Sequence, residues 1–224
     1  GFVEQILEII DYLPAKRQTH LFSATLPKGV EKLSKDFQYQ PVLIFTDERS
    51  TPDPIEEIVY PVSEHQKLDL LLELIDEKQI RSMIVFARTR KKTDWLFNEL
   101  WRRDYSADVL HSEKTLTQRR DTMAKFKDEK FKILLATDIA ARGLDIEHVS
   151  HVTNFDLPDD PQDYIHRVGR TGRIGRTGVA WSLMDPSELI LLAKIERIIG
   201  KRIKEVKLEN FEYEEAIAGA QKSG

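Results

Sequence analysis

The sequence predicts an α/β protein with a doubly wound parallel sheet, and two observations support this prediction. Short apolar runs, such as 83–87 and 132–136, have the length of buried strands. Between these runs lie longer segments in which apolar residues recur every three or four positions, as they do on one face of a helix. Strands that alternate with helices in this way favour a parallel sheet covered by helices on both faces.

The first 54 residues are expected to form separate elements ahead of that sheet. Apolar residues keep helical spacing at the start of the chain until Pro14, and Pro27 opens a second helical pattern. Strands are expected over 19–22 and 42–45. The stretch 46–54 contains two prolines and several charged residues, so it is the best linker candidate in the chain.

Beyond the linker, most helical patterns begin with a capping signal. Thr89, Thr115 and Asp160 can each accept a hydrogen bond from the first turn of the helix that follows. Ser63 with Gln66 has the spacing of a capping box. The expected strands are 58–62, 83–87, 107–110, 132–136, 151–154 and 179–184, and the last helix is expected to run from Asp185-Pro186 to Gly200.

Composition excludes several classes of protein. Hydrophobic residues make up 41% of the 224 residues and charged residues 32%, and no apolar run reaches membrane-spanning length. The absence of cysteine excludes disulfides and thiolate zinc sites, and it fits an intracellular protein. We expect a cytoplasmic location, or a nuclear one in a eukaryote. His148 and His151 lack a further ligand cluster, so no metal site is predicted.

The most unusual stretch runs from His166 to Gly178 and reads His-Arg-Val-Gly-Arg-Thr-Gly-Arg-Ile-Gly-Arg-Thr-Gly. It contains four arginines and no acid, although the whole chain has 38 Asp and Glu against 34 Lys and Arg. Guanidinium groups suit phosphate geometry, and closely spaced glycines let backbone N–H groups approach an anion. The stretch therefore indicates a phosphate site, with a solvated basic turn as the alternative on this loop alone.

A second stretch, from Ala136 to Asp145, follows an apolar run and reads Ala-Thr-Asp-Ile-Ala-Ala-Arg-Gly-Leu-Asp. Its polar residues fall at the carboxyl end of the expected strand, the edge where open α/β sheets bind ligands. Together with Ser23-Ala24-Thr25 and the arginine stretch, it resembles three signature motifs of the DEAD-box RNA helicases, in the family's order. The resemblance extends from Gly1 to about Leu208, and it implies a RecA-like fold.

The resemblance implies roles in ATP hydrolysis. Arg170 and Arg173 would contact the γ-phosphate, with Arg173 as the arginine finger, and Asp145 would accept a hydrogen bond from the ribose. His166 would link to the catalytic motifs of the first RecA-like domain. The catalytic residues implied in this way are Ser23, Thr25, His166, Arg170 and Arg173, and the ATP-binding residues are Asp145, Arg170 and Arg173.

The resemblance also implies contacts to RNA that do not depend on base sequence. The residues concerned are Arg88, Thr89, Arg119, Thr137 and Gly143. Phe86 would pack beneath the arginine motif, although a simple core role is the alternative. His111-Ser112-Glu113 stands where the family usually has His-Gly-Asp, and Leu116 replaces a glutamine that would support Arg119. For any of the implied site residues alone, a cap or turn role is the alternative.

Two family motifs are absent from the sequence. There is no Gly-x-x-x-x-Gly-Lys-Ser/Thr loop and no Asp-Glu-Ala-Asp, so ATP with Mg²⁺ would be bound mainly by a first domain outside this chain. We therefore expect 1–46 to end a first RecA-like domain, 47–55 to be a linker, 56–208 to form the second domain and 209–224 to be an acidic tail. Self-association through 1–46 is one expected way to cover that remnant.

The function expected from these motifs is that of the C-terminal half of an ATP-dependent RNA helicase, inactive by itself. Its expected partners are RNA and a first RecA-like domain, without a membrane. A stand-alone RNA- or protein-binding module is the alternative, and a DNA helicase of the wider superfamily is a third.

Overall fold

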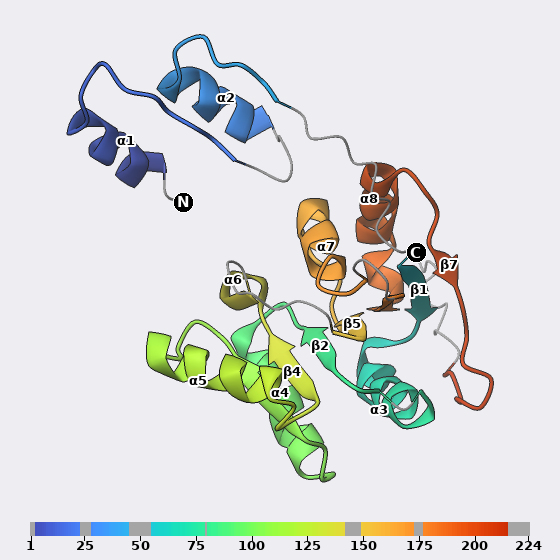
Figure 1. Cartoon of the computed structure of the whole chain (residues 1–224). Coiled ribbons are helices and arrows are strands. Elements are labelled where there is room, and N and C mark those ends of the chain that lie inside the picture. The colour runs from blue at the N-terminus through green and yellow to red at the C-terminus, as the bar shows by residue number, and fades with distance from the viewer. Residues whose placement is uncertain are drawn as a thin grey trace, which may run out of the picture. The chain divides into compact units, whose positions relative to one another are not determined.

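The computed structural model describes residues 3–22, 28–44, 55–78, 80–141, 149–172 and 177–214. The chain divides into two compact units, Gly1–Arg49 and Ser50–Gly224 (Figure 1). No helix among the described residues is both long enough and apolar enough to cross a membrane.

The first unit contains two helices among its described residues, α1 (Val3–Asp11) and α2 (Lys28–Phe37). The strands expected over 19–22 and 42–45 are not formed at residues 19–22 or 42–44, so that prediction was wrong, and residue 45 lies outside the described residues. The reason is that a strand is defined by its hydrogen bonds to a neighbour, and this unit offers no sheet within its described part. Residue Thr19 is instead bonded to Gln38, directly after α2, whose side-chain amide donates a 3.0 Å hydrogen bond to the Thr19 carbonyl.

The second unit is built on a parallel sheet with the strand order β3-β4-β2-β5-β6-β1-β7. This confirms the predicted α/β class. The strands are β1 (Glu56–Pro61), β2 (Met83–Phe86), β3 (Ala107–Leu110), β4 (Ile133–Ala136), β5 (His151–Asn154), β6 (Val179–Met184) and β7 (Lys204–Glu205). The helices are α3 (Lys67–Glu77), α4 (Arg90–Trp101), α5 (Leu116–Lys127), α6 (Asp138–Ala141), α7 (Pro161–Val168) and α8 (Leu189–Ile199), with single 3-10 turns at Glu64–Gln66 and Pro186–Glu188.

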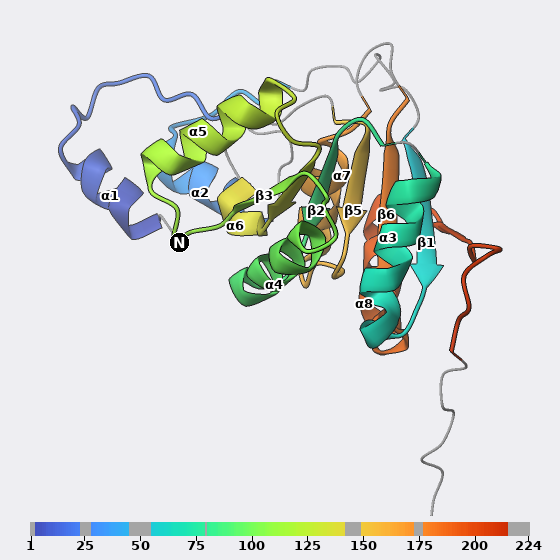
Figure 2. The ribbon, with the colours of Figure 1, turned by 90° about the horizontal axis from the view of Figure 1, so that it is seen from below.

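Helices cover both faces of this sheet because the strands are apolar on both sides. Met83 and Val85 of β2 pack with α3 and α4, which lie in front of the strands in Figure 2. Ile84 and Phe86 point to the other face, where α5 and α6 cover one half of the sheet. The other half of that face is covered by α7 and α8. A doubly wound sheet of this kind leaves its carboxyl edge open for loops.

Most of the predicted helix boundaries are confirmed. The Thr89 and Asp160 side chains accept hydrogen bonds from the first turns of α4 and α7, and Thr115 forms a full capping box with Gln118. Gly200 ends α8 in the left-handed conformation, with φ of 73°, which glycine adopts without steric cost.

The capping box predicted at Ser63 is not formed, because the Gln66 side chain has other partners. Its Nε2 donates to the Glu212 carbonyl at 2.9 Å, and its Oε1 accepts from the Glu214 backbone N–H at 3.0 Å. Phe211 and Tyr213 pack against the core from this segment. Residues 209–214, assigned from the sequence to an acidic tail, thus lie against α3, and residues 215–224 lie outside the described part.

His151 gives the fold a pH-dependent stability. Its ring centroid lies 4.7 Å from that of Trp181, and burial lowers its pKa to about 4. Below pH 6.5 the unfolded chain binds a proton that the folded imidazole does not, so stability falls as pH falls toward 4. Between pH 7.5 and 5, wild type should lose about 2 kcal/mol more unfolding free energy than His151→Gln, measured by urea denaturation. Parallel pH dependences for the two proteins would contradict this account.

Candidate nucleotide and RNA interface

The candidate site lies at the carboxyl edge of the sheet. The ends of β2, β4 and β5 lead into the segments that begin at Arg88, Thr137 and Asp156, and α7 returns to the same edge. Since β2 pairs in register with both β4 and β5, these three strand ends are neighbours. The structure therefore brings two of the sequence motifs together, the stretch after β4 and the arginine stretch on α7.

Arg167 joins these motifs through a buried guanidinium that is 2% exposed. Its Nε and one terminal nitrogen donate to both carboxylate oxygens of Asp138, at 2.6 and 2.7 Å. The other terminal nitrogen donates to the Asn154 side chain at 2.9 Å and to the Asp156 carbonyl at 2.8 Å. A buried cation is tolerated only when its donors are satisfied, so this geometry fixes α7 against α6 and β5.

Phe86 lies directly under this group. The guanidinium carbon of Arg167 is 5.0 Å from the centre of the Phe86 ring, and Phe86 is 1% exposed within the core that includes α5 and α6. Both expectations for Phe86, a core residue and a support beneath the arginine motif, are therefore met by the same ring. The contact adds a cation–π attraction in a position without solvent.

Arg119 lies beside the segment that contains Thr137. One terminal nitrogen donates a 2.6 Å hydrogen bond to the Ala140 carbonyl in α6, and Thr137 accepts backbone hydrogen bonds from Ala140 and Ala141. The Nε of Arg119 is buried and has no hydrogen-bond partner in the structure. A buried donor without an acceptor costs free energy, so a phosphate oxygen that accepts from this Nε would be stabilising.

Arg88 and Thr89 meet in the loop between β2 and α4, but their polar groups are already engaged. The Arg88 guanidinium donates to the Glu188 carboxylate at 3.0 Å and to the Leu157 carbonyl at 3.2 Å. The Thr89 hydroxyl caps α4 by accepting from the Lys92 N–H. Both residues remain exposed, so an additional contact to a ligand is sterically open to them.

A network of buried charges supports this loop from below. Asp156, 1% exposed, accepts from the Arg88 N–H at 2.8 Å and pairs with Lys92 at 2.5 Å. Burial raises the pKa of Asp156, but these hydrogen bonds and cations outweigh burial, so that the pKa is lowered overall. The fully buried Lys67 ammonium lies 2.7 Å from Glu188 and 3.9 Å from Asp156. Each buried acid is thus matched by a cation.

Two other site residues predicted in the arginine stretch, His166 and Arg170, are less buried than Arg167. The His166 side chain is 46% exposed, with its Nδ1 3.7 Å from the Asp163 carboxylate. Arg170 is partly buried, and its Nε donates to the His166 carbonyl at 3.2 Å. Ser23, Thr25, Gly143, Asp145 and Arg173 were also predicted as site residues, and all five lie outside the described residues. In the described part of the chain no group of His, Cys, Asp or Glu is arranged to hold a metal ion.

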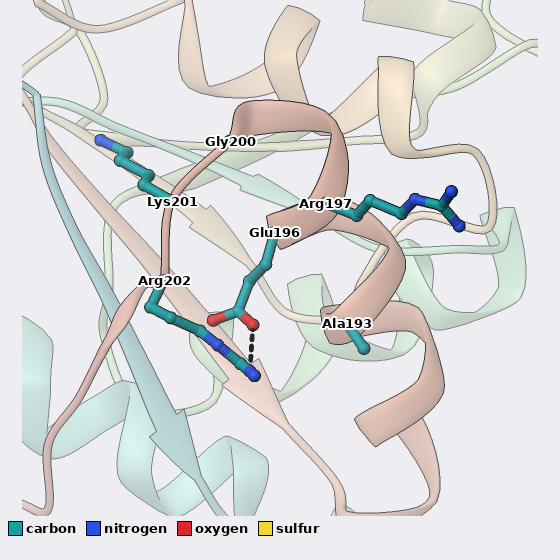
Figure 3. Close-up of a pocket in the computed structure, with 6 residues that line it drawn as sticks. All are labelled: Ala193, Glu196, Arg197, Gly200, Lys201 and Arg202. Carbon is teal, nitrogen blue, oxygen red and sulfur yellow. Dashed lines mark hydrogen bonds and ion pairs between the residues drawn. The ribbon is translucent and has the colours of Figure 1, made fainter.

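A cleft of about 390 Å³ lies away from this edge, at the end of α8 (Figure 3). Its position is fixed by Lys201, which pairs at 2.6 Å with Glu57 near the start of β1, so the cleft is at the amino edge of the sheet. Figure 3 shows Arg202 turned toward Glu196, while Lys201 and Arg197 point away from that pair. The cations do not converge, and the cleft does not contribute to the candidate site.

Several residues of the site were missed by the sequence prediction, chiefly Arg167, Asp138 and Asp156. One signal for Arg167 was available. It lies three residues after Tyr164 and next to Val168, and all three are buried on the same side of α7. An arginine on an apolar helix face needs a buried acid, and Asp138 directly after a strand was a candidate partner.

The hub around Arg167 should dominate the stability of this edge. Arg167→Ala leaves the partly buried Asp138 carboxylate and the buried Asn154 side-chain oxygen without their partner, which should lower the unfolding free energy by about 3 kcal/mol. The matched control is Arg120→Ala, an exposed arginine on α5, which should change the unfolding free energy by less than about 0.5 kcal/mol. Urea denaturation followed by circular dichroism measures both. Equal small losses in the two variants would show that the hub does not hold the edge.

Known proteins share both the sequence and the fold of this chain. Residues 66–175 match the family described as the helicase conserved C-terminal domain. The chain is 40% identical over 223 residues to the DEAD-box ATP-dependent RNA helicase CshA of Geobacillus kaustophilus, covering 99% of this chain and 47% of CshA. The chain thus spans about half the length of this curated relative.

Solved structures extend the similarity to the fold. The chain is 35% identical to the C-terminal domain of the DEAD-box protein Dbp5, covering 69% of this chain and 91% of that one, with a TM-score of 0.65. It is 31% identical to S. cerevisiae Dbp5 bound to RNA and ADP BeF3, covering 94% of this chain and 56% of that one, with a TM-score of 0.83. On the strength of this identity and this RecA-like sheet, the chain belongs to the DEAD-box RNA helicase family and contains its C-terminal helicase domain.

Proposed function

We propose that this chain supplies the C-terminal half of an ATP-dependent RNA helicase that unwinds or remodels RNA duplexes and RNA–protein complexes. In this proposal it contributes the arginine finger and half of the RNA-binding surface, and a first RecA-like domain contributes the rest. RNA and ATP are substrates inside cells, so the proposed location is intracellular and cytoplasmic.

The observation that carries the proposal is the Arg167 hub. On one side of it, α7 bears His166 and leads to Arg170, which the resemblance assigns to the nucleotide. On the other side, Asp138 opens α6 directly after Thr137, which the resemblance assigns to RNA. Because one buried guanidinium holds both segments, a movement of α7 toward a nucleotide would carry the RNA-facing segment with it. A helicase requires such a mechanical link between its two substrates.

The nucleotide side would act through two arginines of the arginine stretch. Arg170 and Arg173 would stabilise the negative charge that develops on the γ-phosphate, and Asp145 would accept a hydrogen bond from the ribose. When bound, ATP with Mg²⁺ supplies the phosphoanhydride bond that is hydrolysed. We assign no Mg²⁺ ligand to the described residues, in which no suitable acidic cluster is found. His166, Ser23 and Thr25 would act where the two RecA-like domains meet.

The RNA side would act through contacts to the phosphate backbone. The Arg119 Nε, buried and without a partner in the structure, is the donor that best supports this role. Arg119 contacts α6 through the Ala140 carbonyl, Thr137 directly precedes α6, and Gly143 follows it in the sequence. Arg88 and Thr89 would extend the same surface at the end of β2. Contacts of this kind bind RNA regardless of its base sequence.

The test compares two arginine substitutions in this chain joined to a first RecA-like domain. Arg173→Lys keeps the charge but loses the planar fork, so it should lower maximal ATP turnover on the order of 10³-fold and leave nucleotide-independent RNA binding nearly intact. Arg119→Ala should instead raise the RNA concentration needed for stimulation and reduce the salt dependence by about one phosphate contact. Steady-state ATPase against RNA concentration at two salt concentrations measures both effects.

The control is this chain alone, which should hydrolyse ATP no faster than buffer because it lacks the phosphate-binding loop. If Arg173→Lys changes only the apparent RNA affinity, the arginine loop is an RNA clamp and the finger assignment is wrong. If the joined protein binds RNA without any RNA-stimulated turnover, the chain is a binding module on a RecA-like fold.

A further inference from the structure

A second cleft, of about 430 Å³, lies at the same edge of the sheet as the Arg167 hub. It is lined by Arg88 and Thr89 from the loop after β2, by Lys91, Lys92 and Trp95 from the first turns of α4, and by Asp156 after β5. This volume falls within the range of small-ligand sites, about 300–1,000 Å³. The cleft therefore adjoins two residues, Arg88 and Thr89, for which RNA contacts are proposed above.

Among the charged side chains that line this cleft, Lys91 is the cation without an ion pair in the described part of the chain. The only acid in the lining, Asp156, is buried and already held by the Arg88 N–H and the Lys92 ammonium. Lys92 and Arg88 also pair with Glu64 and Glu188. Lys91 is exposed and forms no ion pair within the described part of the chain. An ammonium in this situation suits a phosphate, since it can approach one without breaking an internal contact.

Trp95 gives the cleft an aromatic wall. It is 43% exposed, and its one aromatic neighbour among the described residues is Phe155, at 6.3 Å between ring centroids with an angle of 64°. Phe155 is itself 1% exposed and lies under the Lys92 ammonium at 5.3 Å. The indole is thus held at one edge by the core and leaves much of its surface to water. A large ring beside a free cation is the combination that binds nucleotides of single-stranded nucleic acids.

We propose that this cleft binds one nucleotide of single-stranded RNA, with its base stacked on Trp95 and its phosphate at Lys91. The nucleotide would extend the strand that passes over Arg88 and Thr89, so this inference rests on the proposed function and adds a base contact to it. Stacking tolerates any base, so the contact would raise RNA affinity without selecting a sequence.

Trp101 provides a matched control for Trp95. It lies on the same helix, is 68% exposed and does not line the cleft. In this chain joined to a first RecA-like domain, Trp95→Ala should weaken binding of a single-stranded oligouridylate about five-fold or more. Trp95→Phe should retain most of the affinity, because a phenyl ring still stacks. Trp101→Ala should bind like wild type.

The decisive comparison uses an oligomer of the same length that has abasic sites, which keeps the phosphates and removes the bases. Wild type and Trp95→Ala should bind this oligomer equally, whereas Lys91→Ala should bind both oligomers more weakly and with a lower salt dependence. Circular dichroism verifies that each variant is folded.

Three results would overturn the proposal: equal affinity of wild type and Trp95→Ala for the oligouridylate, an equal loss on the abasic oligomer, or a loss shared by Trp101→Ala. If wild type and Trp95→Ala bind the oligouridylate equally, and a protein partner binds wild type but not Trp95→Ala, the cleft is a protein-docking site. Failure of the broader helicase proposal is distinguishable, because wild type itself would then show no RNA-stimulated ATPase.

Discussion

The arrangement of this carboxyl edge depends on one buried guanidinium. Arg167 is almost without solvent, and a cation in that position is stable only with a complete set of acceptors. The acceptors come from two segments: Asp138 at the start of α6, and Asn154 with the Asp156 carbonyl at the end of β5. If one of these segments moved away alone, the Arg167 guanidinium would lose acceptors while it stayed in the low-dielectric interior. The exposed residues of α7 and the segment after β4 are therefore held together as one unit.

A second layer of buried charge explains which cations remain for ligands. The acids that follow β5 and β6, Asp156 and Glu188, are paired with Lys67, Lys92 and Arg88. These cations are committed to the fold. Lys91 and the Arg119 Nε have no such partner within the described residues, and our proposals assign an RNA phosphate to each of them. The sequence alone would not separate the paired cations from the unpaired ones, because Lys91 is the direct neighbour of Lys92.

The fold was largely predictable because local signals agreed with the sheet. Apolar runs located β2, β4 and β6, and the caps at Thr89, Thr115 and Asp160 began their helices as expected. The failures had non-local causes. The strands predicted over 19–22 and 42–45 needed a neighbouring strand, and the described part of this unit has none. The Gln66 side chain does not form the predicted cap because it bonds the backbone of Glu212 and Glu214, far along the chain.

The candidate site residues were named from motifs, and their roles stay predictions. The strand order brings the segments that carry His166, Arg170 and Thr137 to one edge of the sheet. The partners of Arg167 and the internal pairing of Arg88 were not predictable, because a sequence does not show which acid a buried cation meets across 29 or 100 positions.

The most direct test of the Arg167 hub is a double-mutant cycle with Asp138. The unfolding free energies of Arg167→Ala, Asp138→Ala and the double variant are compared with wild type by urea denaturation. If the pair holds α7 to α6, Asp138→Ala leaves the buried Arg167 charge without its partner, and Arg167→Ala does the same to the partly buried Asp138 charge. The double variant should then lose about 2 kcal/mol less than the sum of the two single losses. Losses that add to within about 0.5 kcal/mol would show that the two residues act independently, and would contradict the account of this edge as one unit.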